Sequence, residues 1–416
     1  MVAKLLFGVK LVTKAATNMN TKKRILIIGP GMEIGGVERS LLGLLGALDY
    51  SRFDVDLFLF SHTGELLKYM SEQATLLPKN KLYELIEKPI KYLFKNGHLF
   101  VGTVRLLTRT IGQLRKRSGF GKNIQYHLCH RILTAFVPAN PVRYDLALGF
   151  FAPHYYLTDR VIASFKIGWV HTDYRAEEYD VAFNRKMWAG LNKIATVSEA
   201  VKLSFCELYP ELSDKVVVVE NVLDPEFVRL QAREFDATIE LAHNGAFTIL
   251  SIGRFCKQKA FDEAISACKM LVDEGRRFRW YFIGYGPDEE ALRKQIVDTK
   301  LSDYVVILGK KENPYPYIVA CDLYAQPSRY EGKAVTVREA QILAKPVLIT
   351  DFPTAQSQLT DGFDGHICPM GAEGIAAGVR YMMDNPQYTR QLAQNAANSD
   401  YSGGEALKEI LSFVND

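Results

Sequence analysis

The sequence predicts an α/β protein made of two doubly wound halves. Its 416 residues exceed what one hydrophobic core usually holds. Apolar, strand-like runs alternate with helix-like segments, which is typical of parallel sheets covered by helices. The alternation pauses at 221–226 (NVLDPE) and then starts again. We therefore expect a basic arm at 1–23, domains at 24–222 and 223–400, and a C-terminal helix at 401–416 that packs back toward the first domain.

The first half opens with a strand, a glycine-rich turn and a helix. Residues 24–29 (RILIIG) are apolar throughout, as a strand buried on both faces should be. A helix-like run follows the turn, and 53–60 (FDVDLFLF) reads as the next strand, so parallel pairing is expected. Further strand-like segments lie at 145–151, 166–170, 193–197, 215–220, 247–252, 280–284, 305–308, 323–326 and 346–350. Rossmann-like sheets bind ligands at the carboxyl ends of their strands, which predicts a site in the cleft between the halves.

The overall composition fits a folded soluble protein. Hydrophobic residues make up 48% and charged residues 24% of the chain. The six cysteines are scattered without a C-x-x-C or a zinc-type cluster, which favours buried thiols in a reducing compartment. The first 23 residues lack a signal-peptide pattern, and no apolar run approaches the length of a membrane span. We expect a cytoplasmic protein, with Met1 and Met19 both open as the start.

Positive charge is concentrated in one helical segment of the first half. Residues 79–143 carry seven Lys and six Arg against two Glu, a balance of +11, whereas the whole chain has a net charge of +4. Apolar residues interleave with these charges, as in basic amphipathic helices that lie on anionic membrane surfaces. A solvated helical face over a core is the alternative. No RNA-binding motif or zinc finger accompanies the segment, so no nucleic-acid partner is expected.

Two carboxylates stand near the end of a strand-like segment of the second half. Residues 327–340 (PSRYEGKAVTVREA) place Glu331 at the end of a loop, and a helix is expected over Gly332–Ile342 with Glu339 two turns inside it. Eight residues of helix span about 12 Å, a length that suits a nucleotide sugar. The free N–H groups of the first turn can receive a diphosphate. On spacing alone, the pair could equally be ordinary helix carboxylates.

Cations and glycines follow two other strands of the second half. Arg254 and Lys259 lie five residues apart on one loop, where they can offset the charge of a diphosphate and of a departing nucleoside diphosphate. Gly284 and Gly286 (GYGPD) allow the backbone to approach a base or a ribose closely.

At these three segments the chain resembles the GT-B glycosyltransferases of family 4, over essentially its whole length. The family shows G-R-x₄-K-G, then G-x-G-P, then E-x₇-E, in this order and at similar distances. The resemblance implies that Arg254 and Lys259 bind the donor diphosphate, Glu331 the donor sugar and Glu339 the ribose. It also implies donor contacts at the residues that follow Glu331, namely Gly332, Lys333, Ala334 and Val335.

The first half carries matching segments. The run from Gly35 and Gly36 to Arg39 (GGVER) resembles the family loop that closes over the donor phosphate and sugar. His171, in WVHTD, matches the position where the family has a histidine beside the donor sugar. Residues 197–199 (VSE) resemble a segment with a structural or acceptor-side role. The implied catalytic set is Glu331, His171, Arg254 and Lys259.

Three features depart from the family or imitate another site. Ala260 stands where glycine is usual, and Lys333-Ala334 replaces a frequent Phe-Gly, so the identity of the donor cannot be copied from relatives. Asp54 and Asp56 imitate a metal-binding D-x-D, but their neighbours alternate as on a strand face. No metal is expected, because the cations and the helix N-terminus supply the charge stabilisation.

These observations predict a retaining, metal-independent hexosyltransferase without a cofactor. It would use a nucleoside-diphosphate sugar, with a UDP-sugar favoured, and a glycan acceptor that is lipid-linked at the inner face of the plasma membrane, as in capsule, exopolysaccharide or lipopolysaccharide assembly. The resemblance implies that the leaving phosphate accepts the proton of the acceptor on the same face. Two alternatives remain: a nucleotide-sugar epimerase on the same fold, and a non-catalytic GT-B partner of an active transferase.

Overall fold

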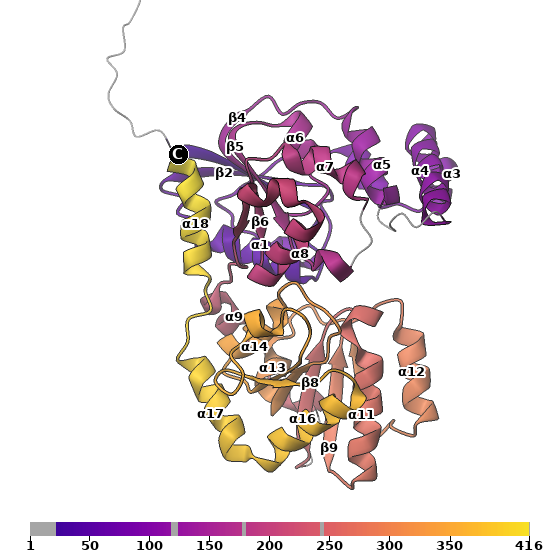
Figure 1. Cartoon of the computed structure of the whole chain (residues 1–416), viewed down its shortest axis with the longest axis vertical. Coiled ribbons are helices and arrows are strands. Elements are labelled where there is room, and N and C mark those ends of the chain that lie inside the picture. Colours follow the sequence, from indigo (N-terminus) through magenta and orange to yellow (C-terminus); the bar gives the residue numbers. More distant parts are fainter. Residues whose placement is uncertain (1–21, 118–123, 177–179, 242–244, 416) are drawn as a thin grey trace, which may run out of the picture.

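The computed structural model describes residues 22–117, 124–176, 180–241 and 245–415 and contains two parallel sheets. Figure 1 shows the two domains one above the other, each with helices around its sheet. The seven-stranded sheet has the order β3-β2-β1-β4-β5-β6-β7, and the six-stranded sheet has the order β10-β9-β8-β11-β12-β13. This confirms the predicted class, two doubly wound α/β halves.

The strands of the first sheet are β1 (Lys23–Gly29), β2 (Phe53–Leu59), β3 (Thr75–Leu76), β4 (Arg143–Gly149), β5 (Ile162–Val170), β6 (Lys193–Thr196) and β7 (Val216–Val218). Those of the second are β8 (Phe247–Ile252), β9 (Phe278–Ile283), β10 (Val305–Gly309), β11 (Leu323–Gln326), β12 (Val347–Thr350) and β13 (His366–Cys368). The sequence did not predict β3 and β13, which are two and three residues long and lie at sheet edges.

The helices of the first domain are α1 (Gly36–Ala47), η1 (Glu65–Tyr69), α2 (Lys81–Ile86), α3 (Ile90–Lys95), α4 (Leu99–Arg117), α5 (Ile124–Thr134), α6 (Tyr155–Arg160), η2 (Tyr174–Ala176), α7 (Val181–Ala189), α8 (Glu199–Leu208) and η3 (Pro210–Lys215). Those that follow are α9 (Pro225–Gln231), α10 (Thr238–Leu241), η4 (Lys257–Lys259), α11 (Phe261–Asp273), α12 (Glu289–Asp298), α13 (Tyr315–Ala320), α14 (Val335–Ile342), α15 (Ala355–Gln358), α16 (Ala372–Asp384), α17 (Pro386–Ala397) and α18 (Gly404–Asn415).

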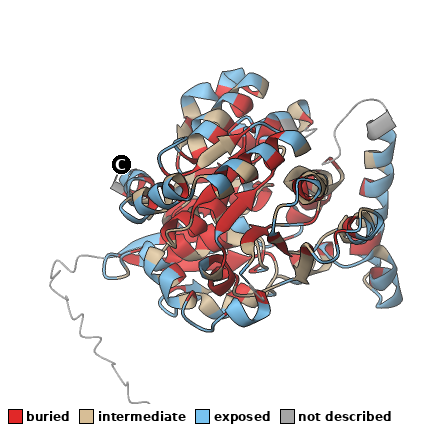
Figure 2. Ribbon diagram, turned by 90° about the horizontal axis from the view of Figure 1, so that it is seen from below, coloured by how far each residue is buried: buried red, intermediate tan, exposed pale blue. Residues whose placement is uncertain are grey.

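Strand order fixes where a ligand site can form in each domain. In the first sheet the order reverses between β1 and β4, and in the second between β8 and β11. Because all strands in each sheet run parallel, the loops after these strands gather at one edge. Figure 2 shows that burial is concentrated in the sheets, which hold these loops in place.

The C-terminal helix α18 lies beside the first domain, and the segment that follows α17 leads to it from the second domain (Figure 1). The ring of Phe413 stacks on Phe165 of β5 with 5.0 Å between centroids, and Ile410 is buried in the core of the first domain. Apolar burial therefore ties the two ends of the described chain to one domain.

The basic segment forms the helices α2 to α5. In Figure 1, α3 and α4 lie at the outer edge of the first domain, beyond α5. Within the described ranges, no helix is long and apolar enough to cross a membrane.

Three histidines are buried inside the first domain. The imidazole of His127 is hydrogen-bonded to Asn184, with 2.7 Å between Nδ1 and Oδ1, and Nε2 of His154 donates to the Trp169 carbonyl at 3.3 Å. His130 packs against the Tyr83 ring. Burial lowers the pKa of His127 to about 4 and that of His130 and His154 to about 3, because the charged imidazolium is poorly solvated there.

We predict that these histidines destabilise the protein on mild acidification. In the unfolded chain these imidazoles bind protons near pH 6.5, and in the folded chain only near pH 4 or below. Between these values each imidazole lowers the free energy of unfolding by about 1.4 kcal/mol for every pH unit of acidification. Glu38, whose pKa burial raises to about 7, opposes this trend with one carboxyl group. The thermal midpoint should fall steadily from pH 6.5 to 4.5, and less steeply for His130→Phe. A flat profile, or an unchanged slope in the variant, would contradict the assignment.

Candidate functional site

Two loops at strand ends of the second domain touch through their backbones. The loop after β9 passes the loop after β8 so closely that a Cβ at Gly284 would lie 1.9 Å from the Gly253 carbonyl oxygen. A Cβ at Gly286 would lie 2.3 Å from the Phe255 carbonyl oxygen. Only glycine fits at both positions, so the G-x-G-P turn fixes the loop that carries Arg254 and Lys259.

Lys259 and Glu331 form a buried ion pair at the centre of this domain edge. Nζ of Lys259 lies 2.6 Å from Oε1 of Glu331, which also accepts a hydrogen bond from Ser328 at 2.5 Å. Gln258 donates to the other oxygen, Oε2, at 3.3 Å. The loops after β8 and β11 thus meet at a carboxylate held by three donors, which fixes its orientation.

Arg254 differs from Lys259 in its surroundings. It is exposed, and it makes no hydrogen bond or ion pair with another residue of the described ranges. Lys259 is paired with Glu331, whereas the charge of Arg254 is available to an anionic ligand.

The helix that follows Glu331 starts later than predicted. α14 begins at Val335, and residues 332–334 precede it in extended or turn conformation. Two contacts explain this: Gly332 packs on the backbone of the first domain, and the Ala334 N–H donates to Oε1 of Gln358 at 2.6 Å. The prediction that the chain is helical all the way from Gly332 to Glu339, with about 12 Å between the two carboxylates along the axis, was therefore wrong. The N–H groups of Val335 and Thr336 still have no partner within the helix and start its positive dipole end.

Gly332 is the point where the second domain touches His171 of the first. A Cβ at position 332 would lie 2.1 Å from the His171 carbonyl oxygen. The carbonyl of Gly332 accepts a hydrogen bond from Ser198, which caps α8, at 3.3 Å. The sequence segments around His171 and Ser198 therefore both meet the loop of Glu331.

The imidazole of His171 is held as a neutral acceptor. Its Nε2 donates to the Phe150 carbonyl at 2.9 Å, which leaves Nδ1 unprotonated. Burial lowers the pKa of His171 to about 4, so the ring is neutral at pH 7. Nδ1 is thus able to accept a hydrogen bond from a ligand hydroxyl.

The glycine loop of the first domain faces the start of α14. A Cβ at Gly36 would lie 3.5 Å from the Val335 side chain, and Gly35 precedes α1. Glu38, in the first turn of α1, is half-buried, and burial raises its pKa to about 7. Sequence reasoning gave Glu38 no role, although its place directly after the glycines was a usable signal.

Glu339 binds across the domain boundary. Its Oε1 accepts from Nη1 of Arg39 and from the Tyr315 hydroxyl, each at 2.8 Å. The Arg39 guanidinium also lies 4.9 Å from the centre of the Tyr315 ring. Burial alone would lower the pKa of Arg39, but the Glu339 carboxylate raises it overall, so Arg39 stays charged. Sequence reasoning missed Tyr315, since nothing local links it to a residue 24 positions away.

Lys333 is buried and turns toward the first domain. Its ammonium forms an ion pair with Glu220, just after β7. Burial lowers the pKa of Lys333, and the Glu220 carboxylate opposes that effect. The residue that replaces the usual aromatic thus adds an ion pair between the domains.

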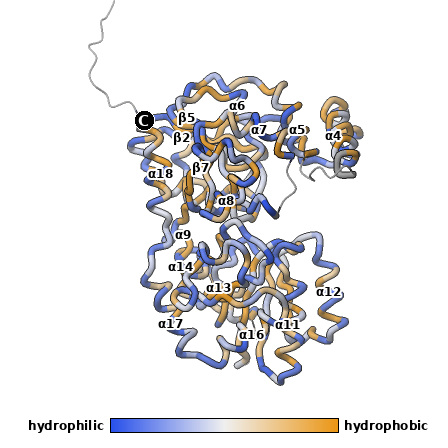
Figure 3. Tube along the Cα trace, in the orientation of Figure 1, coloured by the Kyte–Doolittle hydropathy of each residue, from blue (hydrophilic) through white to orange (hydrophobic). Residues whose placement is uncertain are grey.

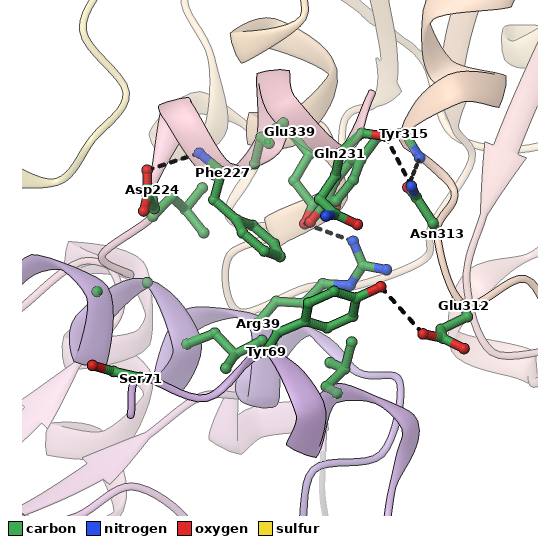
Figure 4. Close-up of a pocket in the computed structure, with 16 residues that line it drawn as sticks. Arg39, Tyr69, Ser71, Asp224, Phe227, Gln231, Glu312, Asn313, Tyr315 and Glu339 are labelled. Atoms are coloured by element: carbon green, nitrogen blue, oxygen red, sulfur yellow. Dashed lines mark hydrogen bonds and ion pairs between the residues drawn. The ribbon is translucent and has the colours of Figure 1, made fainter. Parts of the chain in front are cut away.

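A cavity of about 120 Å³ lies behind the Glu339 cluster (Figure 4). Arg39, Tyr315 and Glu339 form its polar end, while Tyr69 and Phe227 pack edge to face beside it. The cavity lies between α1, α9 and α13, and Glu331 and Lys259 are not part of its wall. Arg254, on the same loop as Lys259, does not line it either.

Asp54 and Asp56 lie on β2, away from these loops. Asp56 is buried, pairs with Arg24 at 3.2 Å and accepts a hydrogen bond from Tyr144 at 2.8 Å. Asp54 faces solvent and lies 3.7 Å from Lys22. Both carboxylates have partners on the strand faces, as the alternation of their neighbours indicates.

Residues 232–399 match the model of the family described as glycosyl transferases group 1. Among curated proteins, the chain is similar to the amylovoran biosynthesis glycosyltransferase AmsK of Erwinia amylovora, 29% identical over 174 residues that cover 40% of this chain and 41% of that protein. It is also similar to alpha-D-kanosaminyltransferase of Streptomyces kanamyceticus, 28% identical over 36% of this chain and 39% of that protein. The matches span about two fifths of the length of these relatives.

Solved structures match over nearly the whole chain. HepE of Anabaena in complex with UDP-glucose has a TM-score of 0.67 at 16% identity and covers 94% of this chain and 99% of its own. TarM of S. aureus, in a complex that includes UDP, has a TM-score of 0.67 at 14% identity, covering 95% and 100%. At such identities the likeness establishes the fold, which is GT-B.

We predict that Gly332→Ala disturbs the contact between the domains. The new Cβ must displace the His171 backbone, and such overpacking costs about 1–3 kcal/mol. Chemical denaturation should show this loss of stability. Gly404→Ala is the matched control, because its Cβ meets only the Ser402 side chain at 3.6 Å. Equal stability of the two variants would show that the backbone contact is not tight.

Proposed function

We propose that the protein is a hexosyltransferase, because residues 232–399 match the model of the glycosyl transferases group 1 family and the chain has the GT-B fold. It moves a hexosyl unit from a nucleoside-diphosphate sugar to a hydroxyl group of a glycan. The observation that carries this proposal is the buried Lys259–Glu331 pair at the start of α14, with Arg254 on the same loop.

The donor diphosphate binds at the positive groups of the second domain. Arg254 and Lys259 supply two cations, and α14 supplies the N–H groups of its first turn. These groups stabilise the negative charge that grows on the leaving diphosphate, so a divalent metal is not required. UDP is the favoured nucleotide, because similar folds such as HepE bind UDP and UDP-glucose.

Glu331 and His171 orient the donor sugar. Three donors hold Glu331, so its carboxylate is suited to accept hydrogen bonds from sugar hydroxyls and not to attack the anomeric carbon. This differs from glycosidases, in which a free carboxylate acts as the nucleophile. Neutral His171 offers Nδ1 to another hydroxyl from the opposite domain.

The transfer retains the anomeric configuration. The acceptor oxygen forms a bond to the anomeric carbon on the face from which the diphosphate leaves. The bond between that carbon and the diphosphate oxygen breaks, and the diphosphate oxygen takes the acceptor proton. Arg254 and Lys259 stabilise the departing charge, so neither Glu331 nor Glu339 needs to form a covalent intermediate.

The acceptor is a lipid-linked glycan used in the synthesis of a cell-surface polysaccharide. Relatives named for amylovoran biosynthesis and for lipopolysaccharide core biosynthesis support a polysaccharide product. A lipid-linked acceptor needs an enzyme that reaches the membrane surface. The helices α3 and α4 offer such a surface.

The outer face of α4 is apolar although it faces solvent. Leu99, Leu106, Leu107 and Leu114 are 61%, 49%, 55% and 58% exposed, and their spacing places them on one side of the helix. Val101 and Val104 on the opposite side are buried in the protein. A helix that is apolar on both sides calls for a second apolar partner. Figure 3 shows α4 at the outer edge of the domain.

Positive charge surrounds this leucine face. Lys88 before α3, Lys91 and Lys95 on α3 and Arg109 on α4 are exposed, and Phe100 packs against Phe136. Anionic lipid headgroups match the charge, and the acyl region matches the leucines. The protein would therefore lie at the cytoplasmic face of an anionic membrane.

We predict that Lys259→Ala and Glu331→Ala each reduce transfer by two or more orders of magnitude, since each removes a charged group of the donor site. The assay measures free UDP and glycan product from UDP-hexose with and without acceptor, and NMR reads the anomeric configuration. Asp54→Ala on β2 is the control and should keep full activity.

The outcome of this assay separates the candidate functions. Product that requires acceptor and keeps its configuration supports the proposal. An altered sugar nucleotide without acceptor would instead indicate an epimerase. Near-normal turnover in both site variants, or no turnover in the wild type with any UDP-sugar, would reject it in favour of other chemistry or a non-catalytic partner role.

We predict that Leu106→Ser combined with Leu107→Ser weakens binding to vesicles that contain phosphatidylglycerol at least tenfold, because about 1.4 kcal/mol of lost apolar insertion suffices for that factor. Sedimentation with phosphatidylcholine vesicles at low salt gives the baseline. Ile239→Ser, at an 84% exposed apolar residue of the second domain, is the matched control. Wild-type binding that is equal for neutral and anionic vesicles would remove the electrostatic part of the proposal.

A further inference from the structure

The two oxygens of the Glu339 carboxylate have different surroundings. Oε1 accepts two hydrogen bonds, from Arg39 and from Tyr315. Oε2 is fully buried and has no hydrogen-bond partner within the described part of the chain. A buried carboxylate oxygen without a partner is unfavourable, so its presence indicates a place where a ligand donor is expected.

The partners of Oε1 hold the carboxylate in one orientation. The Arg39 guanidinium rests on the Tyr315 ring, and both donors converge on the same oxygen. One oxygen is therefore fixed, and the other is left as an acceptor.

We propose that Arg39 and Tyr315 are positioning residues, which hold Oε1 of Glu339 so that Oε2 accepts a hydrogen bond from a ribose hydroxyl of the donor. This inference rests on the function proposed above, in which Glu339 receives the ribose. It adds two residues to the nucleotide site that do not touch the nucleotide themselves.

The origin of Arg39 links nucleotide binding to the closeness of the domains. Arg39 belongs to α1 of the first domain, whereas Glu339 and Tyr315 belong to the second. At the start of the same helix, Gly36 faces Val335 across the boundary. The ribose acceptor is thus oriented only while the two domains are in contact, so a bound ribose favours that arrangement.

A comparison of two nucleotides isolates the ribose contribution. Calorimetry would give the Kd of UDP and of 2′,3′-dideoxy-UDP for the wild type, Arg39→Lys, Arg39→Ala and Tyr315→Phe. Arg39→Ala should weaken UDP about tenfold or more and Tyr315→Phe about fivefold, in line with the usual value of a hydrogen bond to a charged group. For dideoxy-UDP both losses should nearly vanish, since no ribose hydroxyl remains to be oriented. Arg39→Lys, which keeps the charge, should recover part of the affinity.

Lys68→Ala is the control. It removes another ion pair between the domains, which the exposed Lys68 side chain forms with Glu312 and not with Glu339. Its UDP affinity should equal that of the wild type. Equal losses for UDP and dideoxy-UDP in the Arg39 and Tyr315 variants would overturn the positioning role, because a merely structural defect affects both nucleotides alike. If the wild type binds UDP no better than it binds phosphate, the proposed function fails first, and the two failures are thereby told apart.

Discussion

Backbone contact between the domains at Gly332 and His171 determines the geometry of the cleft. A side chain at position 332 would overlap the His171 carbonyl, so only glycine lets the loop after Glu331 reach the first domain. That approach delays the start of α14 to Val335 and sets Gly36 against it. Two ion pairs that cross the boundary, the buried pair of Arg39 with Glu339 and the pair of buried Lys333 with exposed Glu220, depend on the same approach. Site residues from both domains therefore meet at this boundary.

Charge is distributed unevenly within this space, and the unevenness suits a diphosphate. Lys259 neutralises Glu331, whereas Arg254 is exposed and has no protein partner within the described ranges. His171 is neutral because of its burial, so it adds an acceptor without adding charge. The region beside α14 is thus positive overall, while hydroxyl acceptors stand at Glu331, His171 and Glu339. A sugar diphosphate needs this combination of cations for its phosphates and acceptors for its hydroxyls.

The sequence predicted the sheets well because parallel strands buried on both faces are continuous apolar runs. It missed β3 and β13, whose two or three residues at sheet edges leave no such run. Motif spacing predicted that Lys259 and Glu331 share a site, and the structure brings them to 2.6 Å. The sequence could not predict where α14 starts or that Arg39 pairs with Glu339. Both depend on contacts between domains, the second between residues 300 positions apart, which no local pattern records.

A crystal structure of the protein with UDP is the most direct test of a nucleotide cleft between the domains. We expect the diphosphate between Arg254 and the first turn of α14, and a ribose hydroxyl within hydrogen-bond distance of Oε2 of Glu339. UDP bound away from both Arg254 and Glu339, or no UDP at millimolar concentration in a crystal with an open cleft, would contradict it.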